Sequence, residues 1–475
     1  MQRKILLLLL LTLSLLSSTA FASAQSPVPA MFLQKEYIHA GSMEYGLYVS
    51  AKVNPQNGLL HLAYYDPSSH NVELAVETQP GTGNCSRNNH FNCEVLFQGS
   101  NIGGVALDIQ NYFIGQISYT QVGVAYIDNN TQSLMYTQKT FSALVPNPSW
   151  TTDTAGDFSS WAPAGEGRSL SLKYMPVSHL AVFAAQISEP TTGAEKGSVA
   201  WVIEHVDGDP IDHTAACGTN LKYECRLIDS AASAGYGYPM DMDINATGNI
   251  EIAYFAAVVQ GSPVPPAVKL AVYVHGSTNT GCSETVKWMC NVVHTMTADA
   301  LSIHAAKSGA DTRRIAALDP DAGALKLLTL VGDGGGNGAT NPNYWLATIQ
   351  DGLGPVWART DMENDLKGFP MISYRRLTGA NTSELMLARP LAAVPGETPN
   401  CNPFLGKFTW VCTSLDSAPE TASSSPSFGA FSSLAVYPNG GLALAYTRMD
   451  TGTVPFQGLY VLRTGFGNFL PLIRR

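Results

Sequence analysis

The chain has 475 residues and a formal net charge of −10; 45% of its residues are hydrophobic and only 13% are charged. So low a charged fraction excludes a charge-rich disordered chain and a coiled coil, and an acidic chain has no general electrostatic reason to bind nucleic acid or anionic lipid. The 43 glycines and 28 prolines favour a loop-rich β fold, while the length alone would suggest about three domains.

Residues 1–24 are predicted to be a signal peptide. Arg3 and Lys4 precede an apolar run over residues 5–16, and the small residues at 22–24 are of the kind that signal peptidase reads. The apolar run is too short to span a bilayer, which takes about 20 residues, and no later segment is typical of a transmembrane helix. We therefore expect cleavage after Ala24 and a secreted or cell-surface protein.

A short apolar phrase, first seen as His61-Leu62-Ala63-Tyr64-Tyr65-Asp66, recurs along the whole mature chain. Each copy is apolar on both faces, which is typical of a strand buried on both sides. One column is aromatic in six of seven copies, and its members lie about 64 residues apart on average: Tyr64, Tyr126, Phe183, Tyr254, Ala317, Tyr374 and Tyr446. Seven units of this length fill residues 25–475 and replace three domains with one closed array.

Each unit contains four predicted strands. In the first unit these are Gly46–Val53, the repeated phrase, Val72–Glu77 and Glu94–Gln98. Four antiparallel strands repeated seven times predict an all-β, seven-bladed β-propeller. The approximate blades are 44–100, 101–155, 168–230, 238–295, 300–350, 356–415 and 430–475. An array of β-sandwiches is the rival fold.

The two ends of the chain predict how the ring closes. The last unit lacks a good fourth strand, and residues 31–39 precede the first strand of unit one without a unit of their own. We expect this N-terminal strand to complete the last blade, because closure removes the open sheet edges that invite aggregation. A β-sandwich array would leave both end segments unexplained.

The eight cysteines fall into four close pairs: Cys85/Cys93, Cys217/Cys225, Cys282/Cys290 and Cys401/Cys412. The partners are 8 to 11 residues apart, and none of the pairs has the C-x2-C spacing that zinc sites favour. They are therefore predicted to be four local disulfides, as in an exported protein. All four lie in connections between the third and fourth strands, on one face of the propeller, where their role is structural.

Searches for catalytic motifs find no G-x-S-x-G elbow, H-E-x-x-H, P-loop or G-x-G-x-x-G. His61 lies in a buried strand and is interpreted as a hydrogen-bonded core histidine. Asp241, Asp243 and Asn245 resemble part of an oxygen-ligand calcium loop. Since they overlap a strand and its turn, the preferred interpretation is structural, and no metal or cofactor is predicted, with calcium as the alternative.

One group of side chains is a candidate binding site. Arg375 and Arg376 end the second strand of unit six, Arg448 ends that of unit seven, and Tyr65 and Asp66 hold the same place in unit one. Ring closure makes these three units neighbours, so all five should approach the face that carries the 2-to-3 loops. Arginines grouped there could hold a carboxylate, sulfate or phosphate group.

Aromatic residues fall in the 4-to-1 connections on that same face, where they could stack on sugar rings: Trp161, Tyr236, Tyr238 and Trp357. In the alternative interpretation these aromatics pack for stability. The arginines then pair with local acids such as Asp361, Glu363 and Asp365.

The seven units resemble bacterial secreted β-propeller repeat proteins over the whole mature chain. They are more distantly similar to sialidase-type propellers, a resemblance that implies an arginine cluster, a tyrosine nucleophile and an acidic partner. The chain departs from that pattern: the Asp-box turn S-x-D-x-G-x-T-W is absent, and residues 151–161, its nearest stretch, have another spacing. Sialidases also have six blades rather than seven, so no residue is carried over from them.

Three functions follow as hypotheses. The preferred one is a secreted, monomeric binding or scaffold module that takes an anionic glycan or a protein on its loop face. The alternative is a glycan-active enzyme, a hydrolase or lyase, which needs two carboxyls, or a tyrosine and a carboxyl, at the mouth of the central tunnel. The third is a purely structural envelope protein.

Overall fold

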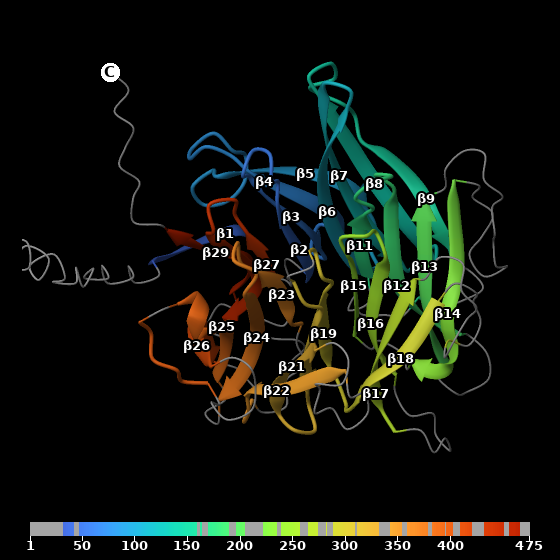
Figure 1. Cartoon of the computed structure of the whole chain (residues 1–475). Coiled ribbons are helices and arrows are strands. Elements are labelled where there is room, and N and C mark those ends of the chain that lie inside the picture. The colour runs from blue at the N-terminus through green and yellow to red at the C-terminus, as the bar shows by residue number, and fades with distance from the viewer. Residues whose placement is uncertain are drawn as a thin grey trace, which may run out of the picture.

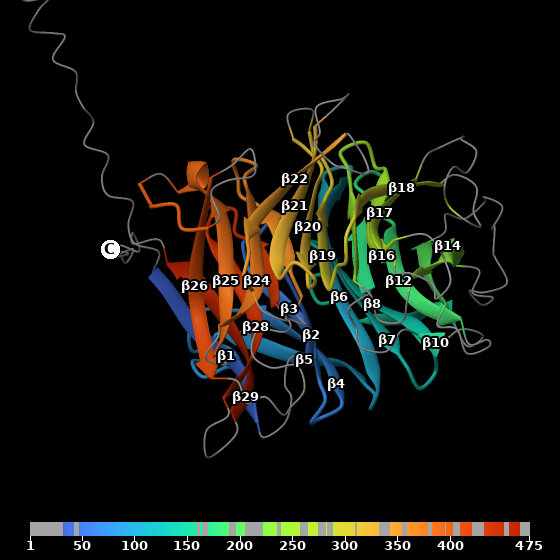
Figure 2. The same cartoon turned by 90° about the horizontal axis from the view of Figure 1, so that it is seen from below.

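The computed structural model describes residues 32–41, 47–158, 162–163, 170–189, 196–204, 222–234, 239–256, 265–273, 282, 288–308, 311–331, 343–353, 359–378, 382–394, 396–401, 409–419, 432–450 and 456–465. Within these residues the strands form seven sheets arranged in a ring (Figures 1 and 2). The predicted all-β, seven-bladed propeller is confirmed. Helix in the described part of the chain amounts to one short 3-10 segment, η1 (Leu391–Ala393). The predicted signal peptide lies outside the described residues.

In blades one to six, four antiparallel strands follow one another in sequence order. Blade one consists of β2 (Leu47–Val53), β3 (Leu60–Asp66), β4 (Asn71–Glu77) and β5 (Phe91–Gln98). Blade two consists of β6 (Ile102–Ile114), β7 (Ile117–Asp128), β8 (Ser133–Ser142) and β9 (Thr151–Asp157). Blade three consists of β11 (Leu170–Tyr174), β12 (Ala181–Glu189), β13 (Lys196–Glu204) and β14 (Tyr223–Ala234). The short β10 (Ala162–Pro163) also pairs with β12 in blade three.

Blades four to six follow the same order. Blade four consists of β15 (Met240–Ile244), β16 (Ile250–Ala256), β17 (Ala267–Tyr273) and β18 (Trp288–Thr295). Blade five consists of β19 (Ala300–His304), β20 (Arg314–Asp319), β21 (Ala324–Leu330) and β22 (Tyr344–Gln350). Blade six consists of β23 (Asp361–Asn364), β24 (Pro370–Thr378), β25 (Thr382–Pro390) and β26 (Trp410–Pro419).

Blade seven is built from both ends of the chain, as the sequence predicts. Its strands are β27 (Ser432–Val436), β28 (Leu442–Asp450), β29 (Phe456–Gly465) and, at the outer edge, β1 (Phe32–Gly41). β1 pairs with β29 in antiparallel register over its whole length, with one bulge between Tyr37 and His39. The N-terminal strand therefore supplies the fourth strand that the last unit lacks.

The apolar core lies between the blades. Among the described residues, each buried cluster combines side chains of neighbouring blades; one joins Tyr136 and Phe158 of blade two to Phe183 and Tyr223 of blade three, and another joins Trp201 to Trp288. Both faces of each blade are thus covered, which explains why the repeated phrase is apolar on both faces.

The aromatic column of the repeat links successive blades. The Tyr254 hydroxyl donates to Asp229 in the last strand of the preceding blade at 2.7 Å. Tyr374 and Tyr446 donate in the same way to the blade before them. A large ring with a polar end suits this place, because its body packs between the blades while its hydroxyl finds an acceptor.

The alignment of the third unit is wrong by two residues. Ser171 of β11 pairs with Ala184, as Ser50 of β2 pairs with Ala63. The residue equivalent to Tyr64 is therefore Ala185, whereas the sequence alignment assigned Phe183. Because side chains alternate with a period of two, a shift by two residues keeps the same face of the strand, and the apolar pattern does not reveal it.

Three of the four predicted disulfides are confirmed: Cys85–Cys93, Cys282–Cys290 and Cys401–Cys412. Each links the connection between the third and fourth strands to the fourth strand of its own blade. Cys225 is also disulfide-bonded, and Cys217 lies outside the described residues, so the Cys217/Cys225 pair stays a prediction.

The buried His61 should make the free energy of unfolding depend on pH in the acidic range. Its ring lies in the buried strand β3, with Nδ1 at 3.0 Å from the Leu59 carbonyl oxygen, and burial lowers its pKa to about 4. Below pH ~6.5 His61 is protonated in the unfolded chain, whereas in the folded protein it stays neutral down to a pH near its lowered pKa. We expect the free energy of unfolding to fall by about 3 kcal/mol between pH 7 and pH 4 through this residue. Denaturant titrations at several pH values should show a flatter profile for His61→Phe; equal slopes would contradict the assignment.

Candidate functional site

The first strands of all seven blades surround a central cavity of about 580 Å³. This is within the range of about 300–1,000 Å³ that is usual for small-molecule sites. Its wall comes from β2, β6, β11, β15, β19 and β23 and from the start of β27. Along each strand alternate side chains point inward, so the wall consists of layers of residues contributed by successive blades.

The first layer, which we call the serine-aspartate layer, contains small polar and acidic side chains. It occupies the position paired with the small residue of the repeated phrase: Ser50, Ala106, Ser171, Asp241, Ser302, Asp361 and Ser433. Several of these side chains accept backbone N–H groups from the next blade. The N–H of Leu107 donates to Ser50 Oγ at 3.1 Å, and that of Met362 donates to Ser302 Oγ at 3.1 Å. The layer therefore connects the inner strands laterally.

The two aspartates of this layer make the most bonds. Asp361 Oδ2 accepts the Leu434 N–H at 2.7 Å and the Ser433 hydroxyl at 2.9 Å. Asp241 accepts the Ile303 N–H at 3.0 Å and hydroxyls from blades three and five. Burial raises the pKa of Asp241, although Lys173 acts in the opposite direction.

The second layer, which we call the charged layer, lies two residues further along each strand. It consists of Lys52, Asp108, Lys173, Asp243, His304 and Glu363, with Ala435 in blade seven. Lys52 is ion-paired with Glu363 at 2.7 Å, although the two residues are 311 positions apart in the chain. Cations and carboxylates thus alternate around much of the cavity.

Asp243 is shared by two lysines. Lys307 lies 2.6 Å from its carboxylate and Lys173 lies 3.6 Å from it. Burial opposes ionisation of Asp243, but the two lysines outweigh it and the pKa of Asp243 is held below its ordinary value. Lys52 and Lys173 likewise overcome the effect of burial on Glu363 and lower its pKa.

Lys173 interacts with carboxylates from several blades. Its side chain is 22% exposed, and burial opposes its charge. Asp243, Asp108, Glu363 and Asp241 nevertheless hold its pKa above the ordinary value. Four carboxylates from three different blades therefore act on one ammonium group, and its N–H bonds can turn toward a molecule in the cavity.

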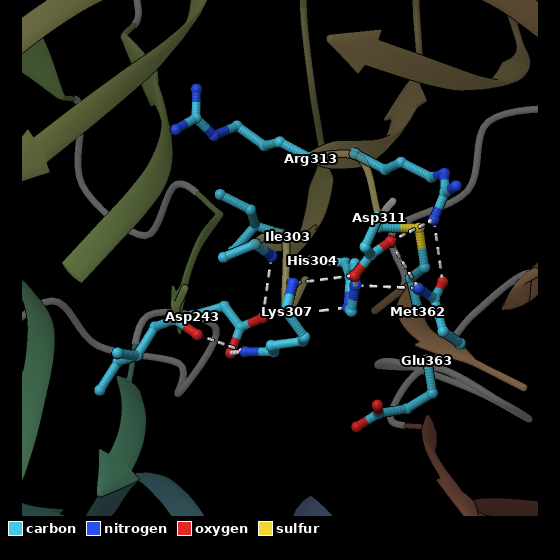
Figure 3. A network of polar contacts seen from close by, with 12 residues as sticks. Asp243, Ile303, His304, Lys307, Asp311, Arg313, Met362 and Glu363 are labelled. Atoms are coloured by element: carbon cyan, nitrogen blue, oxygen red, sulfur yellow. Dashed lines mark hydrogen bonds and ion pairs between the residues drawn. The ribbon is translucent and has the colours of Figure 1, made fainter. Parts of the chain in front are cut away.

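His304, at the end of β19, contributes a histidine to the charged layer (Figure 3). Its Nε2 lies 2.7 Å from Asp311 Oδ2, and its Nδ1 lies 3.9 Å from the carboxylate of Asp243. Figure 3 also shows Lys307 turned toward Asp243, while Glu363 projects from β23 on the opposite side. The histidine is positioned by a carboxylate and can exchange hydrogen bonds with its neighbours.

The predicted arginines lie outside the cavity wall. Arg376 is ion-paired with Glu384 on the neighbouring strand, and Arg448 with Asp416 at 2.8 Å. Arg375 donates from Nε to Ser383 Oγ at 2.6 Å. Successive residues of a strand point to opposite faces, so Arg375 and Arg376 face different neighbouring blades.

The other predicted binding residues have structural surroundings or lie outside the described residues. Tyr65 is buried at 4% exposure. Asp66 accepts the N–H and hydroxyl of Ser68 and so shapes the turn after β3. Trp161, Tyr236, Tyr238 and Trp357 lie outside the described residues. Ligand binding by the arginines, Tyr65, Asp66 and these four aromatics stays a prediction.

The three residues that resemble part of a calcium loop, Asp241, Asp243 and Asn245, have different structural roles. Asp241 and Asp243 belong to the two layers of the cavity wall, and Asn245 Oδ1 accepts the N–H groups of Thr247 and Asn249 within its own turn. In the part of the chain that the structure describes, no group of three or more His, Cys, Asp or Glu side chains is placed to hold a metal ion.

The charged layer was not among the sites predicted from the sequence. Its signal is the recurrence of Lys52, Asp108, Lys173, Asp243, His304 and Glu363 at one position of the first strand in six consecutive units. A strand of a soluble protein rarely points a charge inward unless the charge is paired. Such a recurrence therefore indicates a polar wall, but only once the units are aligned on their first strands.

Comparison with known proteins shows the fold. No model of a known protein family and no curated protein matches the chain. The structure is similar to that of the BP39L lectin from Burkholderia pseudomallei, with 12% sequence identity, a TM-score of 0.50 and coverage of 89% of this chain and 99% of the lectin. The structure is more weakly similar to that of the NanB sialidase of Streptococcus pneumoniae, with 9% sequence identity, a TM-score of 0.37 and coverage of 90% of this chain and 70% of the sialidase. It is also weakly similar to that of an α-L-arabinofuranosidase from Fusarium graminearum, with 9% sequence identity, a TM-score of 0.37 and coverage of 72% of this chain and 92% of that enzyme.

Two further observations concern the protein's surroundings. Among the described residues no helix is long and apolar enough to cross a membrane. The three disulfides are compatible with an extracellular protein, because such bonds persist in oxidising compartments.

Proposed function

We propose that this protein is a secreted or cell-surface glycan-binding module that acts as a monomer and holds a sugar in its central cavity. The observation that carries the proposal is the charged layer, in which ammonium groups and carboxylates alternate around a cavity of about 580 Å³. A sugar hydroxyl both donates and accepts hydrogen bonds. It can therefore bridge Lys173 and a neighbouring carboxylate with charge-assisted bonds, which are the strong ones.

The similarity to a lectin supports the proposal at the level of fold. The lectin's whole length matches this chain, so a propeller of this shape is compatible with sugar binding, although a fold by itself does not fix a function. The cavity, rather than the arginine group, is the site we favour, because Arg376 and Arg448 already have carboxylate partners. A ligand at the arginines would have to displace these acids.

Lys173 provides the test. Lys173→Met keeps most of the side-chain length but removes the three N–H donors, and charge-assisted bonds are worth roughly 1.5–3 kcal/mol each. After a glycan array has identified a ligand, isothermal titration should show affinity at least about tenfold weaker for this variant. Lys222→Met is the matched control, since Lys222 is 66% exposed and lies outside the cavity. Equal affinity in all three proteins would exclude the cavity as the site.

A glycan-active enzyme is the second candidate, and one observation favours it. Within the same cavity burial raises the pKa of Asp108 and Asp241, while Lys52, Lys173 and Lys307 lower those of Glu363 and Asp243. Glycosidases use two carboxyl groups with different pKa values: the one with the raised pKa acts as the acid, and the ionised one acts as the base or nucleophile. A panel of chromogenic glycosides tests this: turnover by the wild type that disappears in Glu363→Gln would establish the enzyme, and absence of turnover would leave the binding module.

A further inference from the structure

The charges on the cavity wall are unequal. Four basic side chains line it: Lys52, Lys173, Lys307 and Arg359. Six acidic ones line it: Asp108, Asp241, Asp243, Asp299, Asp361 and Glu363. The cavity therefore carries an excess of negative charge in its ionised form, which favours a cationic group over an anionic one in a space with low-dielectric walls.

Asp108 is the acid of the charged layer with the least compensation. One of its oxygens accepts the backbone N–H of Tyr174 at 2.9 Å. Among the described residues no lysine or arginine is ion-paired with it, because Lys52 is paired with Glu363 and Lys173 lies nearer to Asp243. The two lysines attract Asp108 only from a distance, and burial raises its pKa in spite of them.

We infer that the cavity binds a sugar that carries a free amino group, held by the carboxylate of Asp108, and that it rejects acidic sugars. The inference rests on the proposed glycan-binding function and names its ligand class. An ammonium group beside Asp108 would supply the cation that this carboxylate lacks, while the hydroxyls of the same ring bridge the paired lysines and acids. A uronate would instead meet the excess of carboxylates, and like charges at close range are unfavourable.

The proposed ligand class differs from the anionic glycan expected from the sequence. That expectation was based on the three arginines. In the cavity the balance of charge is reversed, and the lysines that could attract an anion are already engaged with Glu363 and Asp243.

The experiment compares four probes by isothermal titration: a glucosamine oligosaccharide, its N-acetylated counterpart, a uronic acid oligosaccharide and ethanolamine. We expect the amino sugar to bind at least about tenfold more tightly than the N-acetylated sugar, and the uronate to show no binding. Ethanolamine, which has the ammonium group without the ring, should bind far more weakly than the amino sugar. Raising the salt concentration should reduce only the preference for the amino sugar, because salt screens charges.

Asp108→Asn is the diagnostic variant. The asparagine oxygen can still accept the Tyr174 N–H, so the change removes the charge and leaves the local hydrogen bond. The amino sugar should lose at least about tenfold in affinity, and the N-acetylated sugar should change by less than about twofold. Asp128→Asn is the matched control: it is in the same blade, outside the cavity wall, and its carboxylate likewise accepts a backbone N–H.

The outcomes separate the two proposals. If the N-acetylated or the acidic sugar binds as tightly as the amino sugar, or if Asp108→Asn leaves the preference unchanged, the amino-sugar inference is wrong and the glycan-binding function stands. If no sugar binds and ethanolamine does, the cavity is an amine site and the glycan-binding function is wrong. If none of the probes binds, the amino-sugar inference is wrong, and a glycan array without any ligand would overturn the glycan-binding function as well.

Discussion

Replacing Arg463 by methionine is expected to destabilise the protein by about 3–5 kcal/mol, because the change leaves one buried and one partly buried carboxylate without their arginine. Arg463 lies on β29 and is ion-paired with Glu36 of β1 at 2.5 Å and with Glu77 of β4. The side chain of Glu36 is only 3% exposed. One arginine thus joins the N-terminal strand, the last strand and the first blade, at the place where the ring closes.

Glu36 also connects β1 to blade one. Glu36 also accepts hydrogen bonds from the Ser86 hydroxyl and meets His90 at 2.7 Å, both in the disulfide-bearing loop of blade one. The same loop donates the N–H groups of Ser86 and Arg87 to carbonyl groups of β1. If Glu36 is repelled from its place, β1 should separate and expose the edge of β29, which invites association of chains.

Denaturant unfolding and light scattering test this prediction. Arg463→Met should unfold at a clearly lower denaturant concentration and aggregate at intermediate concentrations. Lys222→Met removes an exposed ion pair with Asp153 and should change stability by no more than about 1 kcal/mol. If the two variants unfold alike, the ion cluster does not hold the ring closed.

The fold could be predicted from the sequence because its signals are local. The repeated phrase is apolar on both faces, which identifies a strand between two layers, and residues 32–41 have no partner within the first unit. These features fix the number of blades and the closure. The pairing of Phe183 could not be fixed, because a shift by two residues along a strand leaves the same face apolar.

The cavity wall was not predicted because it depends on contacts between distant units. Lys52 of blade one and Glu363 of blade six meet only after the ring has closed. Asp241 and Asp243 could be recognised as a strand that leads into a turn, but nothing in that stretch shows that their neighbours are Ser302 and Lys307. The grouping of Arg375 and Arg376 has a different cause, because it overlooks a local rule: adjacent residues of a strand point to opposite faces.

The second large effect is expected for Asp241→Ala. Asp241 is the point at which blades three, four and five meet: its carboxylate accepts the N–H of Met242 at 2.8 Å and that of Ile303 at 3.0 Å. It also accepts the hydroxyls of Ser171 and Ser302, both at 3.1 Å. Alanine would leave the N–H groups of Met242 and Ile303 without an acceptor, and each donor that stays buried costs about 1–3 kcal/mol. The two hydroxyls would keep only their longer contacts, Ser171 with the Met242 carbonyl oxygen and Ser302 with Asp361, both at 3.4 Å.

Two effects limit the loss. Water in the cavity can reach part of the vacated space and satisfy some of the donors. Removal of the carboxylate also removes the cost of burying its charge, a cost that the raised pKa of Asp241 reveals. We therefore expect Asp241→Ala to lower the free energy of unfolding by about 2–4 kcal/mol, and Asp241→Asn, which keeps one acceptor oxygen, to lower it by less.

Denaturant unfolding of both variants beside Glu94→Ala measures this effect. Glu94 is 48% exposed, and its cation partner among the described residues, Lys139, lies 3.7 Å away, so its loss should change stability by no more than about 1 kcal/mol. The order wild type, Asn variant, Ala variant is the signature of a carboxylate that acts as an acceptor. If Asp241→Ala is as stable as the wild type, the serine-aspartate layer does not hold the inner strands. The same carboxylates would then be free to serve the ligand alone.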